Sequence, residues 1–228
     1  MKKILNSKHS AAILFTGGKD SCLALHLAIK KYQINYLLTI IPRNFDSFMF
    51  HKPYLNLLER QSENLGIDLL IKESEGVKEK ELVDLESLIK EIRNKTDVIV
   101  VGGIASSYQG NRIKKICHKL GLKFYAPLWN YTPEKIWKEL LDKKFKVILT
   151  KISCEGIPKE FLGMVIDRKK LEELRRLGER YKFRIDFEGG EAESAVLGMP
   201  EFKKDIIVKY KIKSENVYRH WIDIEDVK

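Results

Sequence analysis

The chain has few cysteines and no long apolar segment, and both absences limit what it can be. Its 228 residues include 3 cysteines, Cys22, Cys117 and Cys154, which are widely spaced and odd in number. This pattern argues against a disulfide framework and against a CxxC metal or redox site, so each cysteine is expected to be a small buried side chain. No window approaches the roughly 18 apolar residues of a membrane span, and the N-terminal apolar stretch is too short for a signal peptide. We therefore expect a cytoplasmic protein that does not bind membranes.

Acidic residues are fewer than basic ones. The chain has 42 Lys and Arg against 32 Asp and Glu, a formal net charge of +10. This excess favours an anionic partner such as a nucleotide, RNA or a ribonucleoprotein-associated protein. A lysine-rich solvated or thermally adapted surface explains the charge equally well, because no arginine-rich or aromatic-interleaved nucleic-acid motif is present. The hydrophobic share of 44% is typical of a globular protein.

Two common phosphate-binding motifs are also missing. Ile13 stands where a Walker A loop needs its first glycine, and there is no G-x-G-x-x-G run. In their place, an apolar run at 11–15 is followed by the turn Thr16, Gly17, Gly18 and by a helical apolar pattern. A plain βα turn is the alternative, but the Lys, Asp and Ser that follow the glycine pair favour phosphate binding. The helix amides, the ammonium of Lys19 and the hydroxyls of Thr16 and Ser21 are expected to converge on that phosphate.

Further apolar runs predict the fold. Strands are expected at 11–15, 34–41, 67–72, 97–102 and 122–125, with four helices between them. This alternation predicts a doubly wound, five-stranded parallel sheet of Rossmann-like α/β class. If the first strand lies beside the fourth, the turns at 16–21 and 102–112 face each other across one crevice. Gly102 and Gly103 are therefore expected at the nucleotide.

The pattern changes at Thr132, which reads as a helix N-cap followed by Pro133. A helix to about 144, a strand at 146–152 and a helix at 168–181 are expected beyond it. We interpret these as a smaller C-terminal α+β domain. The predicted division falls at 131/132, between a phosphate-binding domain at 1–131 and a smaller domain at 132–228.

Near the end of the chain stands FEGGEAES, residues 187–194. Its carboxylates Glu188, Glu191 and Glu193 flank a glycine pair in an otherwise basic protein. Such carboxylates can bind Mg²⁺, receive an ammonium ion or act as a general base, and a solvent-exposed turn is the alternative.

Both motifs resemble those of one enzyme family. FTGGKDS resembles the SGGKDS signature of the N-type ATP pyrophosphatases, or PP-loop enzymes, which split ATP into AMP and pyrophosphate while activating a substrate as its adenylate. Thr16 keeps the hydroxyl of the usual serine. EGGEAES resembles the EGGE-x-E-[TS] signature of the diphthine–ammonia ligase branch, which usually has tyrosine where this chain has Ala192. The segments SFMFHKP, VKEKELVDL, GGIASSYQGNR and PLW extend the resemblance over nearly the whole chain.

The resemblance implies an adenine nucleotide alpha hydrolase-like fold and the last step of diphthamide synthesis on translation elongation factor 2. In that step ATP adenylates the diphthine carboxylate, and ammonia displaces AMP to give the amide. Because no glutaminase signature is visible, the nitrogen is expected to enter as free ammonia. The cofactors implied are ATP and Mg²⁺. The predicted residues are Lys19, Ser21, Glu188 and Glu191 for catalysis; Thr16, Gly17, Gly18, Lys19, Asp20, Ser21, Gly102 and Gly103 for the nucleotide; Asp20 for the metal; and His51, Ser106, Tyr108, Gln109, Arg112 and Glu193 for the substrate.

Two other functions stay open at this point. A PP-loop tRNA-modifying ligase fits the basic charge, although thiolation branches need paired cysteines or an iron–sulfur cluster that three scattered cysteines do not supply. A non-catalytic ATP-binding regulator would use Gly17, Gly18 and Lys19 but gives no reason for the three glutamates. The residues leave the oligomeric state open, a homodimer included.

Overall fold

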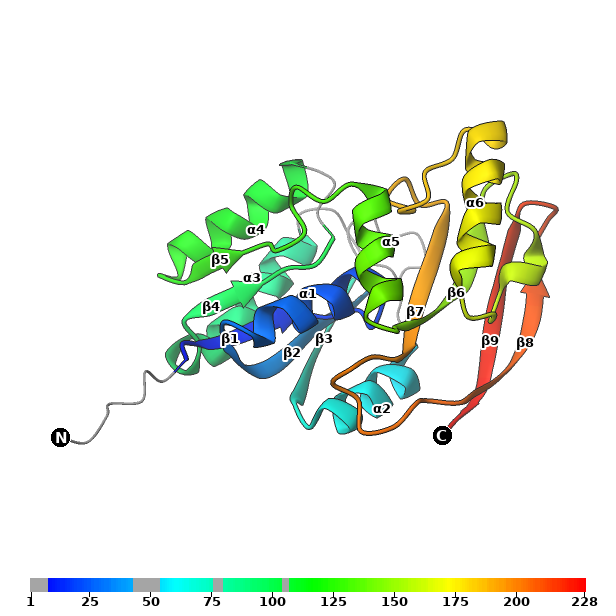
Figure 1. The fold of residues 1–228 in the computed structure, drawn as a ribbon. Helices are drawn as coiled ribbons and strands as arrows, with labels where there is room; N and C mark the ends of the chain where they lie inside the picture. Colours follow the sequence, from blue (N-terminus) through cyan, green and yellow to red (C-terminus); the bar gives the residue numbers. More distant parts are fainter. Residues whose placement is uncertain (1–7, 43–53, 76–79, 104–106) are drawn as a thin grey trace.

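Two β-sheets, one parallel and one antiparallel, lie side by side in the protein (Figure 1). The structure is a computed structural model that describes residues 8–42, 54–75, 80–103 and 107–228. In chain order the elements are β1 (Ser10–Leu14), α1 (Lys19–Ile29), β2 (Gln33–Pro42), α2 (Leu55–Leu65), β3 (Asp68–Ser74), α3 (Lys80–Ile92), η1 (Arg93–Lys95), β4 (Val98–Val100), α4 (Ser107–Lys119), β5 (Lys123–Tyr125), α5 (Pro133–Asp142), β6 (Lys146–Ser153), η2 (Lys159–Phe161), α6 (Arg168–Tyr181), β7 (Ala192–Gly198), β8 (Val208–Ser214) and β9 (Arg219–Val227).

The first sheet is parallel, with strand order β3-β2-β1-β4-β5. Strand β1 is central, and its residues Ala11, Ala12 and Ile13 are fully buried because helices cover both faces of the sheet. The strand order reverses between β1 and β4, which pair in parallel. The doubly wound fold expected from the sequence is therefore confirmed, including the neighbourhood of the first and fourth strands.

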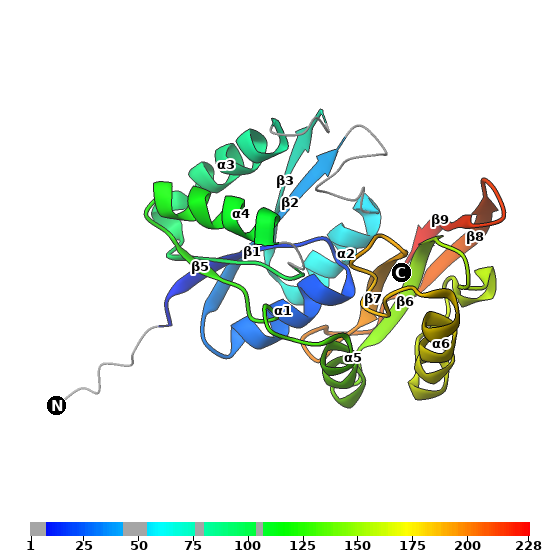
Figure 2. The same cartoon turned by 90° about the horizontal axis from the view of Figure 1, so that it is seen from above.

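Each face of the parallel sheet has its own helical layer (Figure 2). Ala12 packs in a cluster with Leu88 of α3 and Cys117 of α4. Side chains alternate between the faces of a strand, so Ala11 and Ile13 point the opposite way and pack with α1 and α2. The carboxyl ends of the neighbouring strands β1 and β4 lie at the same edge of the sheet, next to the start of α1.

The second sheet has the order β7-β6-β9-β8 and is antiparallel. Helix α5 leads into it and begins as predicted, because the Thr132 hydroxyl accepts a 3.3 Å hydrogen bond from the amide of Lys135 and Pro133 occupies the first turn. Helix α6 and strand β6 also lie where the sequence predicts them. Strands β7, β8 and β9 were not predicted.

The two sheets share one apolar core. A single cluster of buried side chains runs from Ile13 of β1 and Leu25 of α1, through Trp137 of α5, to Ile148 of β6 and Val196 of β7. The turn between β1 and α1 is therefore packed against the antiparallel unit. Within the described ranges, none of the helices combines the length and the apolar character needed to cross a membrane.

Candidate active site

The turn between β1 and α1 presents backbone amides at a helix start. Gly17 has φ +71°, a left-handed conformation that glycine adopts without strain. Gly18 is the N-cap and has no side chain with which to cap the helix. The amide of Lys19 donates a hydrogen bond to Ser194. The neighbouring amides of Gly18 and Asp20 are the ones placed to bind an anion, which the helix dipole also favours.

Two hydroxyls lie at this turn with different exposure. Ser21 is buried, and its Oγ donates a 3.0 Å hydrogen bond to the carbonyl of Gly18. Thr16 is exposed, and its Oγ1 lies 3.3 Å from Oγ of Ser21. Ser21 therefore stabilises the turn, while Thr16 stands at its surface.

The ammonium of Lys19 is fixed by two oxygens. Lys19 is only 2% exposed, and its Nζ lies 2.6 Å from Oδ2 of Asp20 and 2.6 Å from the main-chain oxygen of Asp186. The same ammonium lies 5.7 Å from the ring centre of Phe187. The other carboxylate oxygen of Asp20, Oδ1, is buried and has no hydrogen-bond partner among the residues that the structure describes.

An ion pair holds the segment that supplies the Asp186 carbonyl. Arg184 donates two hydrogen bonds to the Asp186 carboxylate, from Nε at 2.9 Å and from Nη2 at 2.5 Å. Burial by itself raises the pKa of Asp186, but the hydrogen bonds from Arg184 and from the amide of Glu188 outweigh it, and the pKa lies below its ordinary value. Trp137 of α5 fixes the preceding residue by donating a 2.7 Å hydrogen bond from Nε1 to the carbonyl of Ile185.

The glycine pair after β4 lies directly against this turn. A Cβ on Gly102 would come within 2.8 Å of the amide nitrogen of Ser21. A Cβ on Gly103 would lie 2.5 Å from Oε1 of Glu188 and 3.3 Å from Cβ of Asp20. The structure thus brings the second glycine pair, Asp20 and Glu188 together, and a larger side chain at Gly103 would require the Glu188 carboxylate to move.

Glu191 and Glu193 each contact a different part of the protein. The Glu191 carboxylate accepts hydrogen bonds from the amides of Gly189 at 2.9 Å and Arg184 at 3.2 Å, so it folds the acidic turn. Glu193 pairs with Lys151 of β6 at 2.9 Å. The sequence interpretation extended the turn to residue 194, but strand β7 begins at 192 because that segment pairs with β6.

Comparison with known families decides which family this is. The family model for the diphthamide synthase N-terminal domain matches residues 9–124, and the model for the diphthamide synthase C-terminal domain matches residues 132–228. The chain belongs to the diphthamide synthase family. This result confirms the family that the two glycine motifs resemble.

Individual relatives agree with this assignment. The diphthine–ammonia ligases of Bos taurus and Homo sapiens are each 29% identical to this diphthamide synthase family member over 219 residues, which cover 86% of the chain and 82% of either relative. The diphthine–ammonia ligase of Schizosaccharomyces pombe is 30% identical over 222 residues, but the chain covers only 36% of that longer protein. A crystal structure described as a predicted subunit of tRNA methyltransferase from Methanocaldococcus jannaschii aligns with TM-score 0.43 at 18% identity, over 86% of this chain and 99% of that chain. A similarity at that level supports no inference about fold or function.

Several predicted substrate residues cannot be assigned contacts. His51 and Ser106 lie outside the described residues. Tyr108 and Gln109 belong to the first turn of α4, and their side chains lie outside the described part of the structure. Arg112 is partly buried in the next turn of the same helix.

Three contacts of the glycine turn were missed by reasoning from the sequence. Gln61 of α2 and Val196 of β7 both donate to the carbonyl of Gly17, each at 3.0 Å. Ser194 of β7 accepts a 3.2 Å hydrogen bond from the amide of Lys19. Only Ser194 had a signal in the sequence, because it is part of the EGGEAES motif.

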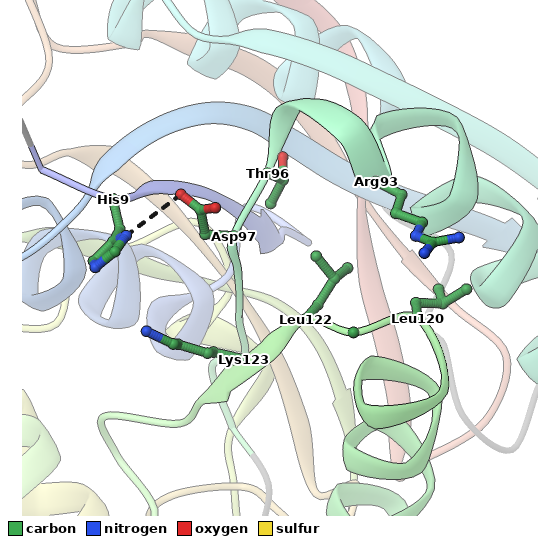
Figure 3. Close-up of a pocket in the computed structure, with 8 residues that line it drawn as sticks. His9, Arg93, Thr96, Asp97, Leu120, Leu122 and Lys123 are labelled. Atoms are coloured by element: carbon green, nitrogen blue, oxygen red, sulfur yellow. Dashed lines mark ion pairs between the residues drawn. The ribbon is translucent and has the colours of Figure 1, made fainter.

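A cavity of about 290 Å³ lies at the opposite end of the parallel sheet (Figure 3). It is lined by residues that precede or begin β1, β4 and β5, among them His9, Asp97 and Lys123, and His9 lies 3.6 Å from Asp97. Open α/β sheets bind ligands at the carboxyl ends of their strands, where both glycine pairs lie. This cavity is therefore separate from the candidate site.

Among the described residues, neither the cysteines nor other potential metal ligands form a further metal or redox site. Burial raises the pKa of Cys117 and Cys154 to about 11 and that of Cys22 further, so the thiols stay protonated at neutral pH. In the part of the chain that the structure describes, no three His, Cys, Asp or Glu side chains are grouped to hold a metal ion.

Proposed function

We propose that the chain is an ATP-dependent ligase that amidates the diphthine of elongation factor 2 with ammonia, through an acyl-adenylate, and releases AMP and pyrophosphate. The ligase class follows from membership in the diphthamide synthase family and from relatives that are diphthine–ammonia ligases. The structural observation that most supports the proposal is the buried ammonium of Lys19 at the start of α1, which pairs with Asp20, while Glu188 lies across Gly103 from Asp20. One small region thus combines a cation, helix amides and two carboxylates.

The nucleotide triphosphate would bind the turn 16–21. When the diphthine carboxylate attacks the α-phosphorus, an oxygen–phosphorus bond forms and the bond to the β-phosphate oxygen breaks. Its electron pair leaves with pyrophosphate. The amides of Gly18 and Asp20 and the ammonium of Lys19 would neutralise that developing charge, and such a donor contributes roughly 3 to 4 kcal/mol in well-studied enzymes. Lys19 would then exchange one of its present oxygen partners for phosphate.

Asp20 also fits the proposed Mg²⁺. A magnesium ion that accompanies ATP is commonly held by one or two carboxylates together with phosphate oxygens. The buried Oδ1 of Asp20 lacks a partner in the described ranges, so it is a suitable ligand. A bound Mg²⁺ would supply further neutralisation of phosphate charge.

Glu188 is the proposed proton acceptor for the second half-reaction. Ammonium must lose one proton before its nitrogen can attack the acyl carbon, and the attacking nitrogen must lose another as the carbon–nitrogen bond forms. The bond from the acyl carbon to AMP then breaks. Glu188 faces Gly103 and Asp20 at the turn, so its carboxylate can receive such a proton. Glu191 would act by holding the turn, through its bonds to Gly189 and Arg184.

The proposed division of the chain at 131/132 places this chemistry between two domains. The family models end and begin on either side of that point, at 124 and 132. The phosphate turn would belong to the first domain and Glu188 to the second. His51, Ser106, Tyr108, Gln109, Arg112 and Glu193 stay predictions for the diphthine substrate.

The test is a reconstitution with defined substrates. The protein is incubated with ATP, Mg²⁺, ammonium and diphthine-bearing elongation factor 2 purified from cells that lack this protein. We expect AMP, pyrophosphate and the amide, with none of them formed from elongation factor already amidated. Formation of pyrophosphate only when tRNA is supplied, or of ADP in place of AMP, would refute the proposal.

A further inference from the structure

We propose that Gln61 is a positioning residue for the nucleotide: its buried side-chain amide fixes the direction in which the phosphate turn presents its backbone. This inference rests on the proposed function, since it assumes that a nucleotide phosphate binds the turn. Gln61 lies on α2, outside both glycine motifs.

The amide of Gln61 connects the turn to the second sheet. Gln61 is fully buried, and its Nε2 donates to the carbonyl of Gly17 at 3.0 Å and to the carbonyl of Val196 at 2.8 Å. The amide of Val196 donates to the same Gly17 carbonyl at 3.0 Å. Gly17 therefore has its carbonyl held by two donors, one from α2 and one from β7.

Fixing that carbonyl also fixes an amide. The peptide joining Gly17 to Gly18 is planar and trans, so the Gly17 carbonyl and the Gly18 N–H point in opposite directions. With the carbonyl directed at Gln61 and Val196, the N–H is directed away from both. A rotation of this one peptide would exchange a donor for an acceptor at the turn, and a carbonyl oxygen facing phosphate would repel it.

The oxygen of the Gln61 amide, Oε1, occupies the space that a side chain on Gly17 would need. A Cβ on Gly17 would lie 2.2 Å from Oε1 of Gln61, and this buried oxygen has no hydrogen-bond partner within the described ranges. Turning the amide over would place Oε1 against two carbonyl oxygens, which are also acceptors. The orientation of the amide is thus determined by the turn that it supports.

A side chain that only connects α2 to the part of the chain around the second sheet would have its partners outside the phosphate turn. Asn64, one turn further along α2, provides that comparison. It is 4% exposed, and its Oδ1 accepts a 3.2 Å hydrogen bond from the amide of Lys204 in the connection after β7. Asn64 is therefore a buried amide on the same helix whose observed partner is not in the turn.

The experiment compares Gln61→Met with Asn64→Leu by calorimetric titration of ATP, with melting temperature and steady-state kinetics on the same samples. Both variants replace a buried amide by an apolar side chain of similar size, so both should melt at lower temperature than the wild type. We expect Gln61→Met to raise Kd and KM for ATP about tenfold while KM for ammonium stays constant. Asn64→Leu should leave the ATP affinity within about twofold of the wild type.

Gln61→Asn provides the same test if the methionine variant fails to fold, because its shorter amide cannot reach both carbonyls. Equal ATP affinities in the Gln61 and Asn64 variants, with the wild type binding ATP normally, would overturn the positioning role alone. A wild type that binds no ATP would instead overturn the proposed function, and the positioning role with it.

Discussion

The ammonium of Lys19 donates a 2.6 Å hydrogen bond to the main-chain oxygen of Asp186, which lies 167 residues further along the chain. The lysine begins α1 in the parallel unit, and the carbonyl belongs to the loop before β7. The cation proposed to bind phosphate is therefore oriented jointly by both halves of the molecule. Changes on either side should alter the same chemistry.

Lys19→Ala should lower the rate of AMP formation by about two to three orders of magnitude, because the charge that develops on departing pyrophosphate loses its closest cation. The measurement is single-turnover AMP release at saturating ATP. Lys30→Ala is the control, since Lys30 is exposed at the other end of α1 and should leave the rate unchanged. A Lys19 variant with near wild-type turnover would remove this residue from the mechanism.

Gly17→Ala should destabilise the protein by at least about 2 kcal/mol more than Gly121→Ala. Both glycines have nearly equal positive φ, +71° and +70°. An added Cβ at Gly17 would collide with Gln61, whereas within 4 Å of one at Gly121 the described residues place no heavy atom. Urea unfolding of both variants gives the difference, and equal losses of stability would show that the turn can widen around a methyl group.

Glu188→Gln should slow amide formation at neutral pH while ATP affinity is retained, because the carboxylate is needed only for the proton of ammonium. The deficit should shrink as the pH rises, since free ammonia then becomes abundant. Glu191→Gln, which alters a carboxylate that folds the turn, should give a loss that does not change with pH. Rate profiles of both variants against pH distinguish the two roles; the assignment to Glu188 fails if its profile runs parallel to that of Glu191→Gln.

Arg184→Gln should cost about 1 to 3 kcal/mol of stability at neutral pH, because the buried Asp186 carboxylate loses its two charge-assisted hydrogen bonds. The pKa of Asp186 is lowered in the folded wild type, so the pair contributes its full stability above the ordinary value of 3.8 and loses it as the pH falls through the lower folded value. The difference from wild type should therefore be complete above about pH 5 and shrink below about pH 4.

Arg60→Gln is the control for that measurement. Arg60 forms a surface pair with Glu63 at 2.8 Å, and the loss of such a pair should cost less than about 1 kcal/mol. Urea midpoints measured from acid to neutral pH would contradict the account if the Arg184 deficit persisted unchanged in acid.

The parallel sheet could be predicted because strands such as β1 and β4 come from continuous apolar runs, at 11–15 and 98–101, and are followed by helices with a clear apolar face. Strand β8 differs from these runs, because its sequence, VKYKIKS, alternates apolar residues with lysine. That period-two pattern is typical of a half-exposed edge strand, and an analysis based on continuous apolar runs missed it.

Part of the candidate site could also be predicted from the sequence and part could not. The glycine turns are recognisable by their residue types and spacing. Gln61 and Asp186 do not, because an amide on an amphipathic helix and an aspartate in a loop are ordinary surface residues until the fold buries them against the turn. Contacts between residues 44 or 167 positions apart leave no local pattern to read.

The most direct test of the acyl-adenylate follows an oxygen atom. Elongation factor 2 whose diphthine carboxylate is labelled with oxygen-18 is converted with ATP, ammonium and this protein, and the products are examined by mass spectrometry. Attack of the carboxylate on the α-phosphorus predicts that one labelled oxygen leaves in AMP. Recovery of the label in inorganic phosphate, or unlabelled AMP beside a fully formed amide, would contradict the acyl-adenylate.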